Sequence, residues 1–316
     1  MNAVGKSSAI FVTLSGLFWG GWVVGSQTPE GQEAIARAYA AYEEQQAAAS
    51  ANLFDSTALR AIVCGDPNST EQKPCLAVVA AGRMFIVDAG SGAASSLSRR
   101  NIPMERLAAV LLTDAELPQV ADLSAVYGAS ARGGAALLPV YGPAETQRLV
   151  DGLNQAGGFD GAARGLQAWG PSPEPGRSVI VFEADGLIVS AFTTQEDAFE
   201  GRVGYRFDYR GRSIVVGGDG RVATAAAARD ADVVLQGAET QRIAQVTGGL
   251  SAAEAALNAQ SLNTGLMVLT GAENPLAAQT QVAEARSAGF NDVAAARVGM
   301  LVELPLANTQ INVRAL

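Results

Sequence analysis

Histidine is absent from this chain of 316 residues, and its absence limits the chemistry that the other polar residues can perform. Nucleophilic catalysis of the Ser-His-Asp or Cys-His type is excluded, because each type needs an imidazole as its base. The glycine-rich pieces at residues 90–92 and 217–220 do not match a phosphate-binding loop and are typical of turns. Carboxylate chemistry remains open. Asp114 and Glu116 alternate along the chain, so both would point the same way from the end of a strand.

Cys64 and Cys75 are the only cysteines, and they fall on two predicted neighbouring strands. A turn-rich stretch separates them, so the two thiols could form a disulfide if this part of the chain lies outside the cytoplasm. The alternative, which the sequence favours, is a pair of buried thiols that pack as small apolar side chains. A zinc knuckle is excluded, because neither cysteine has a histidine or a further cysteine at the required spacing.

The composition argues against nucleic acid as a partner and indicates a partly covered surface. The net charge is −9 and no basic run is present, whereas affinity for RNA or DNA depends on neutralising phosphates. Charged residues make up only 17% of the chain, which predicts that a membrane or a protein partner covers part of the surface. The length allows one large domain or two small ones, with ample residues for a core.

The N-terminal segment carries a targeting signal. Residues 9–24 are apolar or small, Lys6 precedes them, and Glu30 and Glu33 follow. Such a run is at the short end for a membrane span, and Lys6 places the N-terminus in the cytoplasm by the positive-inside rule. We predict a single-pass anchor at residues 1–27 that contacts membrane lipid through residues 9–25, with the remaining chain in a bacterial periplasm. The alternative is a cleaved signal peptide, with Val24 and Ser26 as the small residues before the cleavage site.

After the anchor we predict a helical linker and one layered domain. The linker covers residues 28–57, is rich in alanine and opens with a helix-start signal, Thr28-Pro29-Glu30. The domain covers residues 58–316, where short branched runs bounded by turns predict strands. The predicted strands are 59–64, 75–80, 83–88, 107–113, 179–183, 187–192, 204–209, 213–216, 233–235, 266–269 and 301–304. The predicted helices are 93–101, 118–128, 144–157, 223–229 and 251–260. Strands and helices in both halves indicate an α/β arrangement with two sheets.

Several motifs of the domain occur in the order found in one known family. They are Phe85-Ile-Val-Asp-Ala-Gly90, Leu138-Pro-Val-Tyr-Gly-Pro143, Gly204-Tyr-Arg-Phe-Asp-Tyr-Arg-Gly-Arg-Ser213 and Val216-Gly-Gly-Asp-Gly220. Because of them, the chain from Leu59 nearly to its end resembles the metallo-β-lactamase fold, in particular the ribonuclease Z and arylsulfatase-like phosphodiesterases. The resemblance implies a four-layer αββα sandwich with two zinc ions between the sheet edges.

The first metal motif of that family contains three histidines and an acid, and this chain departs from it at each of those positions. Asp114 and Glu116 replace two histidines, Pro118 replaces the acid, and Gln119 replaces the third histidine. Proline has no side-chain donor, so at least one ligand of the family's site cannot be replaced locally.

The remaining ligand positions, as the resemblance implies them, follow the same pattern. Glu196 lies where the family has its next histidine, and Gly271 lies where it has its last one. Asp219 keeps the family's bridging aspartate. Catalytic zinc needs imidazole ligands to activate its bound water, so the departures exclude zinc as a cofactor.

Two outcomes remain for these positions. The oxygen-bearing residues that the resemblance gathers suit Mg²⁺, Mn²⁺ or Ca²⁺ and are Asp114, Glu116, Gln119, Glu196 and Asp219. Otherwise the acids are solvated remnants without a metal, and crowding would raise the pKa of at least one carboxyl group. We predict the second outcome, with no cofactor bound.

These observations predict a catalytically inactive, membrane-anchored protein that serves as a binding or accessory subunit of a membrane protein complex. One alternative is a residual phosphodiester or ester hydrolase that uses a hard divalent cation at the acidic positions. Another is a small-ligand binding module that uses the old cleft.

Overall fold

The computed structural model describes residues 52–66, 75–134, 136–159, 163–194, 201–218 and 226–316, together with positions 29, 32, 33, 36 and 37. The chain divides into two units, Met1–Asn52 and Leu53–Leu316. The five described positions between residues 29 and 37 are helical. No helix among the described residues has the length and apolar composition that a membrane span requires. The predicted anchor lies outside the described residues.

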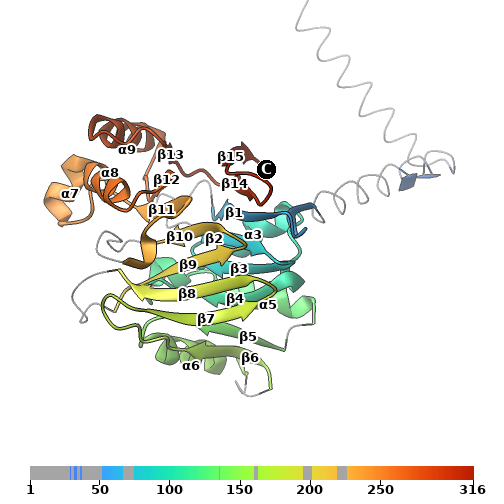
Figure 1. Ribbon diagram of the computed structural model, residues 1–316. Helices are drawn as coiled ribbons and strands as arrows, with labels where there is room; N and C mark the ends of the chain where they lie inside the picture. The colour runs from blue at the N-terminus through green and yellow to red at the C-terminus, as the bar shows by residue number, and fades with distance from the viewer. Residues whose placement is uncertain are drawn as a thin grey trace, which may run out of the picture. The chain divides into compact units, whose positions relative to one another are not determined.

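Two β-sheets form the centre of the second unit (Figure 1). The strands of the first sheet are β1 (Ala58–Cys64), β2 (Cys75–Ala80), β3 (Arg83–Val87), β4 (Leu107–Leu111), β5 (Leu137–Tyr141), β6 (Gly165–Trp169), β14 (Met300–Pro305) and β15 (Asn312–Ala315). Those of the second are β7 (Ser178–Ala184), β8 (Leu187–Thr193), β9 (Val203–Tyr209), β10 (Arg212–Val216), β11 (Val233–Gly237), β12 (Leu266–Thr270) and β13 (Val293–Ala295). The spatial orders are β15-β14-β1-β2-β3-β4-β5-β6 and β13-β12-β11-β10-β9-β8-β7.

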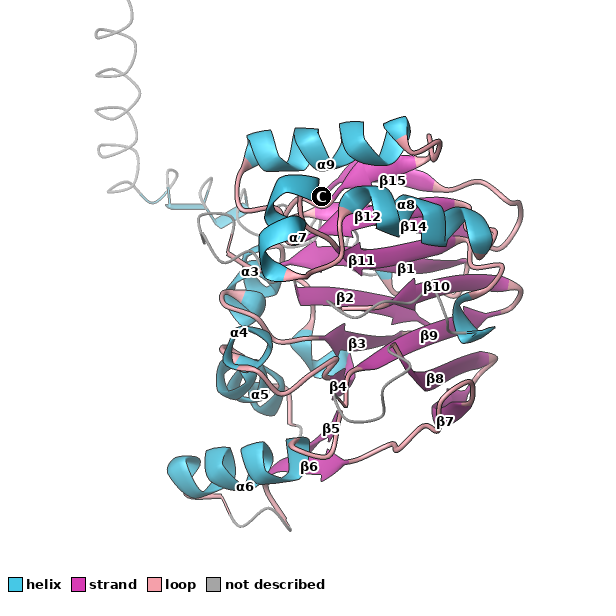
Figure 2. Ribbon diagram, turned by 90° about the vertical axis from the view of Figure 1, so that its left-hand side faces the viewer, coloured by secondary structure: helices cyan, strands magenta, loops and turns pink. Residues whose placement is uncertain are grey.

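Helices cover the outer faces of the two sheets, as Figure 2 shows. The first sheet is covered by α3 (Ala93–Arg99), α4 (Leu117–Val120), α5 (Leu123–Arg132) and α6 (Thr146–Gly157). The second carries α7 (Gln241–Thr247), α8 (Ala252–Ser261) and α9 (Pro275–Ser287). Short 3-10 turns are η1 (Met104–Arg106) and η2 (Ala226–Ala228). The predicted four-layer αββα arrangement of the domain is therefore confirmed.

Central strands such as β1 and β2 read as largely apolar runs because both of their faces are buried. On β1, Leu59, Ala61 and Val63 face the second sheet, whereas Ile62 and Cys64 face the helical layer. This alternation follows from the two-residue period of a strand, and a sheet covered on both sides has no polar face.

Phe85 of β3 occupies the middle of the core between the sheets. Its ring centroid lies 5.9 Å from that of Phe207 on β9 and 5.0 Å from that of Phe182 on β7, in edge-to-face geometry. Such aromatic pairs contribute energy beyond the apolar area that they bury. The family-like motifs that contain Phe85 and Phe207 are thus core elements that hold the two sheets together.

Several elements were not predicted from the sequence, and the predicted helix 118–128 is two helices, α4 and α5. The strand β5 contains Pro139, which disfavours a central strand. Its pairing with β4 uses only Val140 and Tyr141, so the proline lies outside that ladder. The helix α9 has a clear start signal, because the Asn274 side chain accepts a hydrogen bond from the Ala277 amide and Pro275 follows it.

Cys64 and Cys75 form a disulfide, so the expectation of two free buried thiols was wrong. The two residues are direct cross-strand partners of β1 and β2, with their Cα atoms 4.8 Å apart. This separation lies in the range that a disulfide spans. The register of the two strands therefore brings the sulfur atoms together.

Removing this disulfide should destabilise the domain. The Cys64→Ala, Cys75→Ala double variant frees a segment with a sequence separation of 11 residues. The unfolded chain then gains loop entropy, so the free energy of unfolding should fall by about 3 kcal/mol. Urea denaturation measures the change, and wild-type protein under reducing conditions is the matched control. Equal stability of oxidised wild type, reduced wild type and the double variant would contradict the prediction.

Candidate functional site

The positions that correspond to the family's metal ligands lie after the carboxyl ends of β4, β10 and β12. We call this border of the sandwich the site edge; it comprises residues 112–119, 217–218, 236–239 and 271, and lies at the left of Figure 1. The strands β10, β11 and β12 pair in parallel, so their carboxyl ends meet on one side of the second sheet. Polar groups of distant segments are thereby placed side by side.

Hydrogen bonds tie the two sheets together at the site edge. The Asp88 carboxylate accepts from the amide and the hydroxyl of Thr113, each at 2.8 Å. The carbonyl of Thr113 accepts from the Val203 amide at 2.9 Å, which links the end of β4 to β9. The hydroxyl of Tyr205, also on β9, donates to the Leu112 carbonyl at 2.9 Å. Burial, and to a smaller extent the charge of Asp88, raises the pKa of Tyr205, so its hydroxyl stays protonated and donates.

The end of β10 packs against the end of β4. Gly218 has φ +56°, and a Cβ atom there would stand 2.5 Å from the Thr113 hydroxyl oxygen. Its carbonyl accepts from the Gly237 amide at 2.7 Å and from the Gln236 side-chain amide at 3.2 Å. The segment before Asp219 is therefore held tightly, whereas Asp219 and Glu196 themselves lie outside the described residues.

Asp114 and Glu116, which the resemblance places at two histidine positions, share one cation, Arg202. The Arg202 guanidinium lies 3.9 Å from the buried Asp114 carboxylate and 3.5 Å from that of Glu116. Asp114 also accepts from the Glu116 backbone amide at 2.9 Å, which fixes the turn that carries both acids. The two acids share this partner, although they lie beyond the end of β4 and the Asp114 side chain is buried whereas that of Glu116 is 61% exposed.

A polar cavity of about 490 Å³ opens beside these three residues. Glu145 and Arg148, at the start of α6, contribute two further charges to its lining. Arg202, Glu145 and Arg148 were not identified from the sequence. Arg202 precedes the Gly204 motif by two residues, and its charge next to a family motif was the only available signal.

Pro118 and Gln119 belong to α4 and serve its packing. The side chain of Gln119 is only 2% exposed, and its backbone carbonyl accepts from the Ala89 amide at 2.6 Å. Asp122, at the start of α5, donates its own amide to the Ala89 carbonyl. Burial raises the pKa of Asp122, although the amide of Ala94 partly opposes this by donating to its carboxylate. A raised carboxyl pKa therefore occurs beside the site edge, but on a residue outside the predicted set.

Gly271 follows β12 and adopts the left-handed conformation, with φ +85°. The carbonyl of Ala238 lies next to it and accepts from the side-chain amide of Gln281 at 2.7 Å. L-residues with a side chain are strained in this conformation, so the backbone is suited to glycine and not to a histidine ligand.

The residues at the site edge do not fit a pair of zinc ions. Asp114 and Glu116 are oxygen donors already paired with a guanidinium, Pro118 has no donor, and Gly271 has no side chain. Within the described part of the chain, no three His, Cys, Asp or Glu residues are grouped so that they could hold a metal ion. The fold is an αββα sandwich, and the described residues at its site edge do not supply the ligands of a zinc pair.

Comparisons with known proteins agree with this class. No family model matches the chain. It is 25% identical over 226 residues to a ribonuclease Z of Mycolicibacterium gilvum, which covers 65% of this chain and 79% of that protein. It is 27% identical over 163 residues to a ribonuclease Z of Mycobacterium marinum, which covers 48% of this chain and 58% of that protein. The match to the second relative therefore spans little more than half of that relative's length.

Solved structures show the same fold. The metallo-β-lactamase fold protein YhfI from Bacillus subtilis aligns with a TM-score of 0.63 and 18% identity, over 78% of this chain and 99% of that one. The short form of human tRNase Z aligns with a TM-score of 0.61 and 17% identity, over 78% and 99% of the two chains. Together these relatives place the chain in the metallo-β-lactamase fold superfamily.

Restoring a histidine at position 271 should not restore a metal site. The Gly271→His variant forces a side chain into a left-handed conformation, so its free energy of unfolding should fall by about 1 kcal/mol. It should bind no stoichiometric zinc, because no other imidazole is present in the chain. Urea denaturation and metal analysis after dialysis measure both effects.

Gly271→Ala is the matched control, because it introduces the same backbone strain without a ligand. The two variants should lose equal stability. A histidine variant that is as stable as wild type, or that binds one zinc ion per chain, would contradict this account.

Proposed function

We propose that this chain is a catalytically inactive member of the metallo-β-lactamase fold superfamily that acts by binding a partner at a bacterial cytoplasmic membrane. The observation that carries the proposal is the cluster of Asp114, Glu116 and Arg202. Two carboxylates at former ligand positions would repel each other without a cation. A guanidinium supplies the compensating positive charge from within the chain, so the acids need no metal ion.

The residual hydrolase that uses a hard cation is less well supported. Mg²⁺ and Ca²⁺ would take carboxylate oxygens from Asp114 and Glu116. A cation there would have to displace Arg202, whose guanidinium lies 3.9 Å and 3.5 Å from the two carboxylates. Binding would then cost the ion pairs as well as the hydration of the metal, which weakens the site.

Export of the domain is supported by its disulfide. Cys64 and Cys75 are bonded, and disulfides persist mainly outside the cytoplasm. This agrees with the predicted single-pass anchor at residues 1–27 and with Lys6 on its cytoplasmic side. We therefore propose a periplasmic position for residues 58–316.

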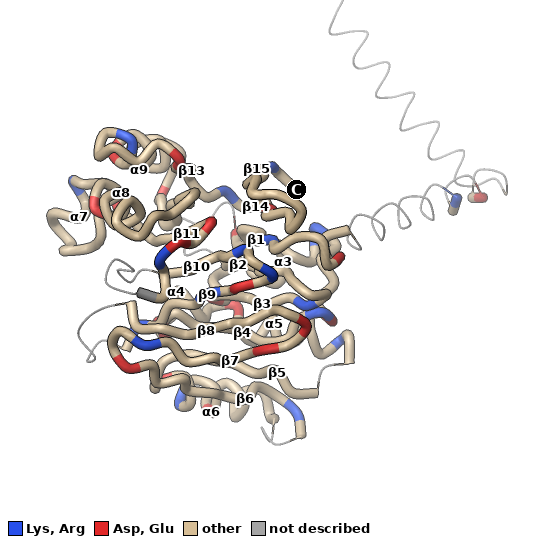
Figure 3. The backbone as a smooth tube through the Cα atoms, viewed as in Figure 1, with Lys and Arg blue, Asp and Glu red and all other residues tan. Residues whose placement is uncertain are grey.

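A protein partner is supported by the surface of the site edge and its flanking helices. Three large aliphatic side chains there are the most exposed of their kind in the described part of the chain: Leu117 is 81% exposed, Val246 86% and Leu276 72%. They belong to α4, α7 and α9, which follow β4, β11 and β12. A contiguous exposed apolar patch is typical of an interaction surface, and we propose that these three side chains belong to one. Along the backbone of the described residues, acidic and basic positions are interspersed without a run of basic ones, as Figure 3 shows, which does not suit nucleic acid.

Purified full-length protein should show neither a bound catalytic metal nor phosphodiesterase activity. After dialysis against Zn²⁺, Mn²⁺, Mg²⁺ or Ca²⁺, metal analysis should find less than one ion per ten chains. Hydrolysis of bis(p-nitrophenyl) phosphate should equal the buffer blank, because no metal-bound water is available as the nucleophile.

Asp219→Ala should change neither result, and Asp151→Ala, on the exposed face of α6, is the control for loss of an acid elsewhere. Stoichiometric Mn²⁺, Mg²⁺ or Ca²⁺ that is lost in Asp219→Ala but retained in Asp151→Ala would overturn the proposal in favour of the residual hydrolase.

The anchoring and the partner role have their own test. The full chain should sediment with membranes after a high-salt wash, and a chain that lacks residues 1–27 but is exported by a foreign signal peptide should not. Native mass spectrometry after gentle detergent extraction should show the chain in a stoichiometric assembly, and Leu117→Ser with Val246→Ser should reduce it. Ile180→Ser, an exposed residue of β7, is the matched control. A chain that stays soluble at full length, or that always appears alone, would contradict the proposal.

A further inference from the structure

The disulfide between Cys64 and Cys75 lies at the end of the β1–β2 hairpin. These two residues are the last pair of the ladder that joins the two strands. Both are buried, at 1% and 0% exposure, among the apolar side chains that pack between the first sheet and its helices. The end of a ladder frays more easily than its centre. Without the covalent bond, this end of the hairpin would depend on backbone hydrogen bonds and packing alone.

The hairpin end is bonded to residues 88–92, which we call the 88–92 loop. Asp66 follows Cys64 by two residues, and its amide donates to the Ser91 carbonyl at 2.9 Å. Gly92 lies so close that a Cβ atom there would stand 2.7 Å from the Asp66 amide nitrogen. The backbone of the loop therefore touches that of the hairpin at a point next to the disulfide.

The 88–92 loop in turn holds α4, the helix that begins with Leu117. The Ala89 amide donates to the Gln119 carbonyl at 2.6 Å, and the Ala89 carbonyl accepts from the Asp122 amide at 2.8 Å. A helix of four residues is too short to be stable on its own. The order of α4, and with it the position of the exposed Leu117 side chain, therefore depends on contacts such as those of Ala89.

The same loop also reaches the site edge. Asp88, its first residue, accepts from the amide and the hydroxyl of Thr113 at 2.8 Å each. The Asp122 carboxylate, just after α4, accepts from the Ala94 amide at 2.8 Å, which adds a bond to the start of α3. A continuous path of bonded groups thus runs from the disulfide through the 88–92 loop to α4 and the site edge.

We propose that oxidation of Cys64 and Cys75 orders α4, so that the surface around Leu117 takes its binding-competent form only after the disulfide has formed. The oxidant is itself a disulfide: its S–S bond breaks as the bond between Cys64 and Cys75 forms. The two thiol protons and two electrons of the cysteines end on its sulfur atoms, which become thiols. Such oxidants act mainly outside the cytoplasm, so a chain that has not been exported would not bind early. The role of Leu117 in partner binding rests on the proposed function, whereas the coupling of the disulfide to α4 does not.

Hydrogen–deuterium exchange of the full chain in amphipol, followed by mass spectrometry, tests this coupling without any partner. Oxidised wild type is compared with wild type reduced by dithiothreitol and with the Cys64→Ala, Cys75→Ala variant. Peptides that cover residues 88–94 and 117–122 should exchange at least about tenfold faster in both samples that lack the bond, because local opening becomes easier. Peptides from β9 and α9 should be unchanged. Reoxidation of wild type with oxidised glutathione should restore the slow exchange.

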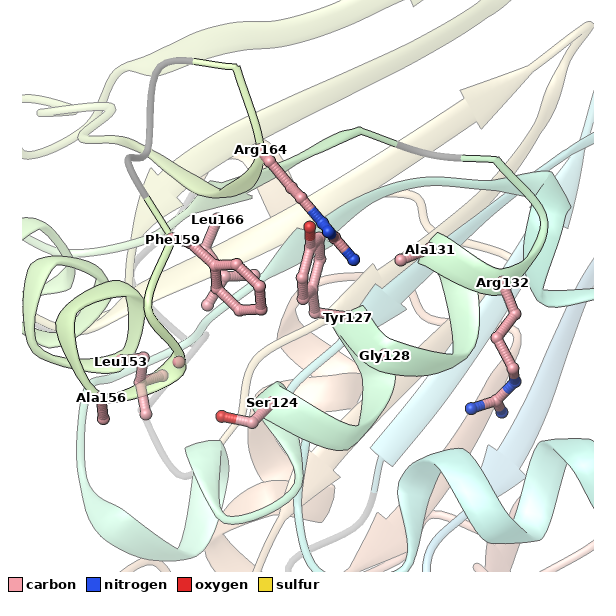
Figure 4. A pocket seen from close by; sticks show the side chains of 11 residues that line it. Ser124, Tyr127, Gly128, Ala131, Arg132, Leu153, Ala156, Phe159, Arg164 and Leu166 are labelled. Carbon is pink, nitrogen blue, oxygen red and sulfur yellow. The ribbon is translucent and has the colours of Figure 1, made fainter.

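Leu166→Ala is the control for a general loss of stability. Leu166 is 3% exposed and lines the cavity of about 520 Å³ between α5 and α6 that Figure 4 shows. None of the residues that line this cavity belongs to the path from the disulfide to α4. Truncation of a buried leucine costs about as much stability as loss of a disulfide. The control should nevertheless leave exchange at residues 117–122 unchanged.

Gly92→Ala tests the path while the disulfide is intact. Its Cβ atom would push the 88–92 loop away from Asp66, so exchange at residues 117–122 should rise as in the double variant. This variant also serves if the double variant does not fold. Unchanged exchange at 117–122 in reduced wild type or in Gly92→Ala, or an equal rise in Leu166→Ala, would overturn the proposal. A chain with the expected exchange that never appears with a partner would contradict the proposed function and not this coupling.

Discussion

Burial of the inner faces of the two sheets is the constraint on which the rest of this structure depends. Phe85, Tyr205 and Phe207 are fully enclosed there, on the strands β3 and β9, which are hydrogen-bonded to the site edge through Asp88 and Val203. This packing consists of apolar contact and needs no metal ion. The frame of a metallohydrolase can therefore keep its shape when the residues at its ligand positions change. A chain without histidine can have this fold because the ligands of the family's site are not part of its core.

The site edge is itself stabilised by hydrogen bonds and ion pairs within the chain. Asp88 binds the backbone and hydroxyl of Thr113, and the Thr113 carbonyl binds the Val203 amide of the other sheet. The Arg202 guanidinium supplies a positive charge beside the carboxylates of Asp114 and Glu116. Through these groups, the loops of the site edge are bonded to other parts of the same chain. These contacts fix the geometry of the edge, and a preorganised surface loses less conformational freedom when it binds.

The sequence predicted the parts of the fold that depend on local pattern and missed those that depend on contacts between distant segments. The apolar runs of β1 to β4 and the order of the family motifs were sufficient for the sandwich. The disulfide was judged wrongly, because bonding depends on the register that pairs Cys64 with Cys75 across a turn, and composition does not determine that register. Arg202 was missed because its acidic partners, Glu116 and Asp114, precede it by 86 and 88 residues. The contact between segments so far apart is not visible in the sequence. The strand β5 was missed because it contains Pro139, which lies in the ladder with β6, whereas only Val140 and Tyr141 pair with β4.

The backbone conformation and the contacts of Gly271 do not suit a metal ligand at this position. A metal ligand at this position would need a backbone that directs a side chain toward the other loops, yet the chain here turns with φ +85° beside the Ala238 carbonyl. Gln281 secures that carbonyl from α9, so the left-handed turn is supported by the helix packed against it. A reversal of one substitution would therefore strain the loop without assembling a site, because each position is now part of a different set of contacts. The turn at Gly271 is therefore part of the packing between the end of β12 and α9.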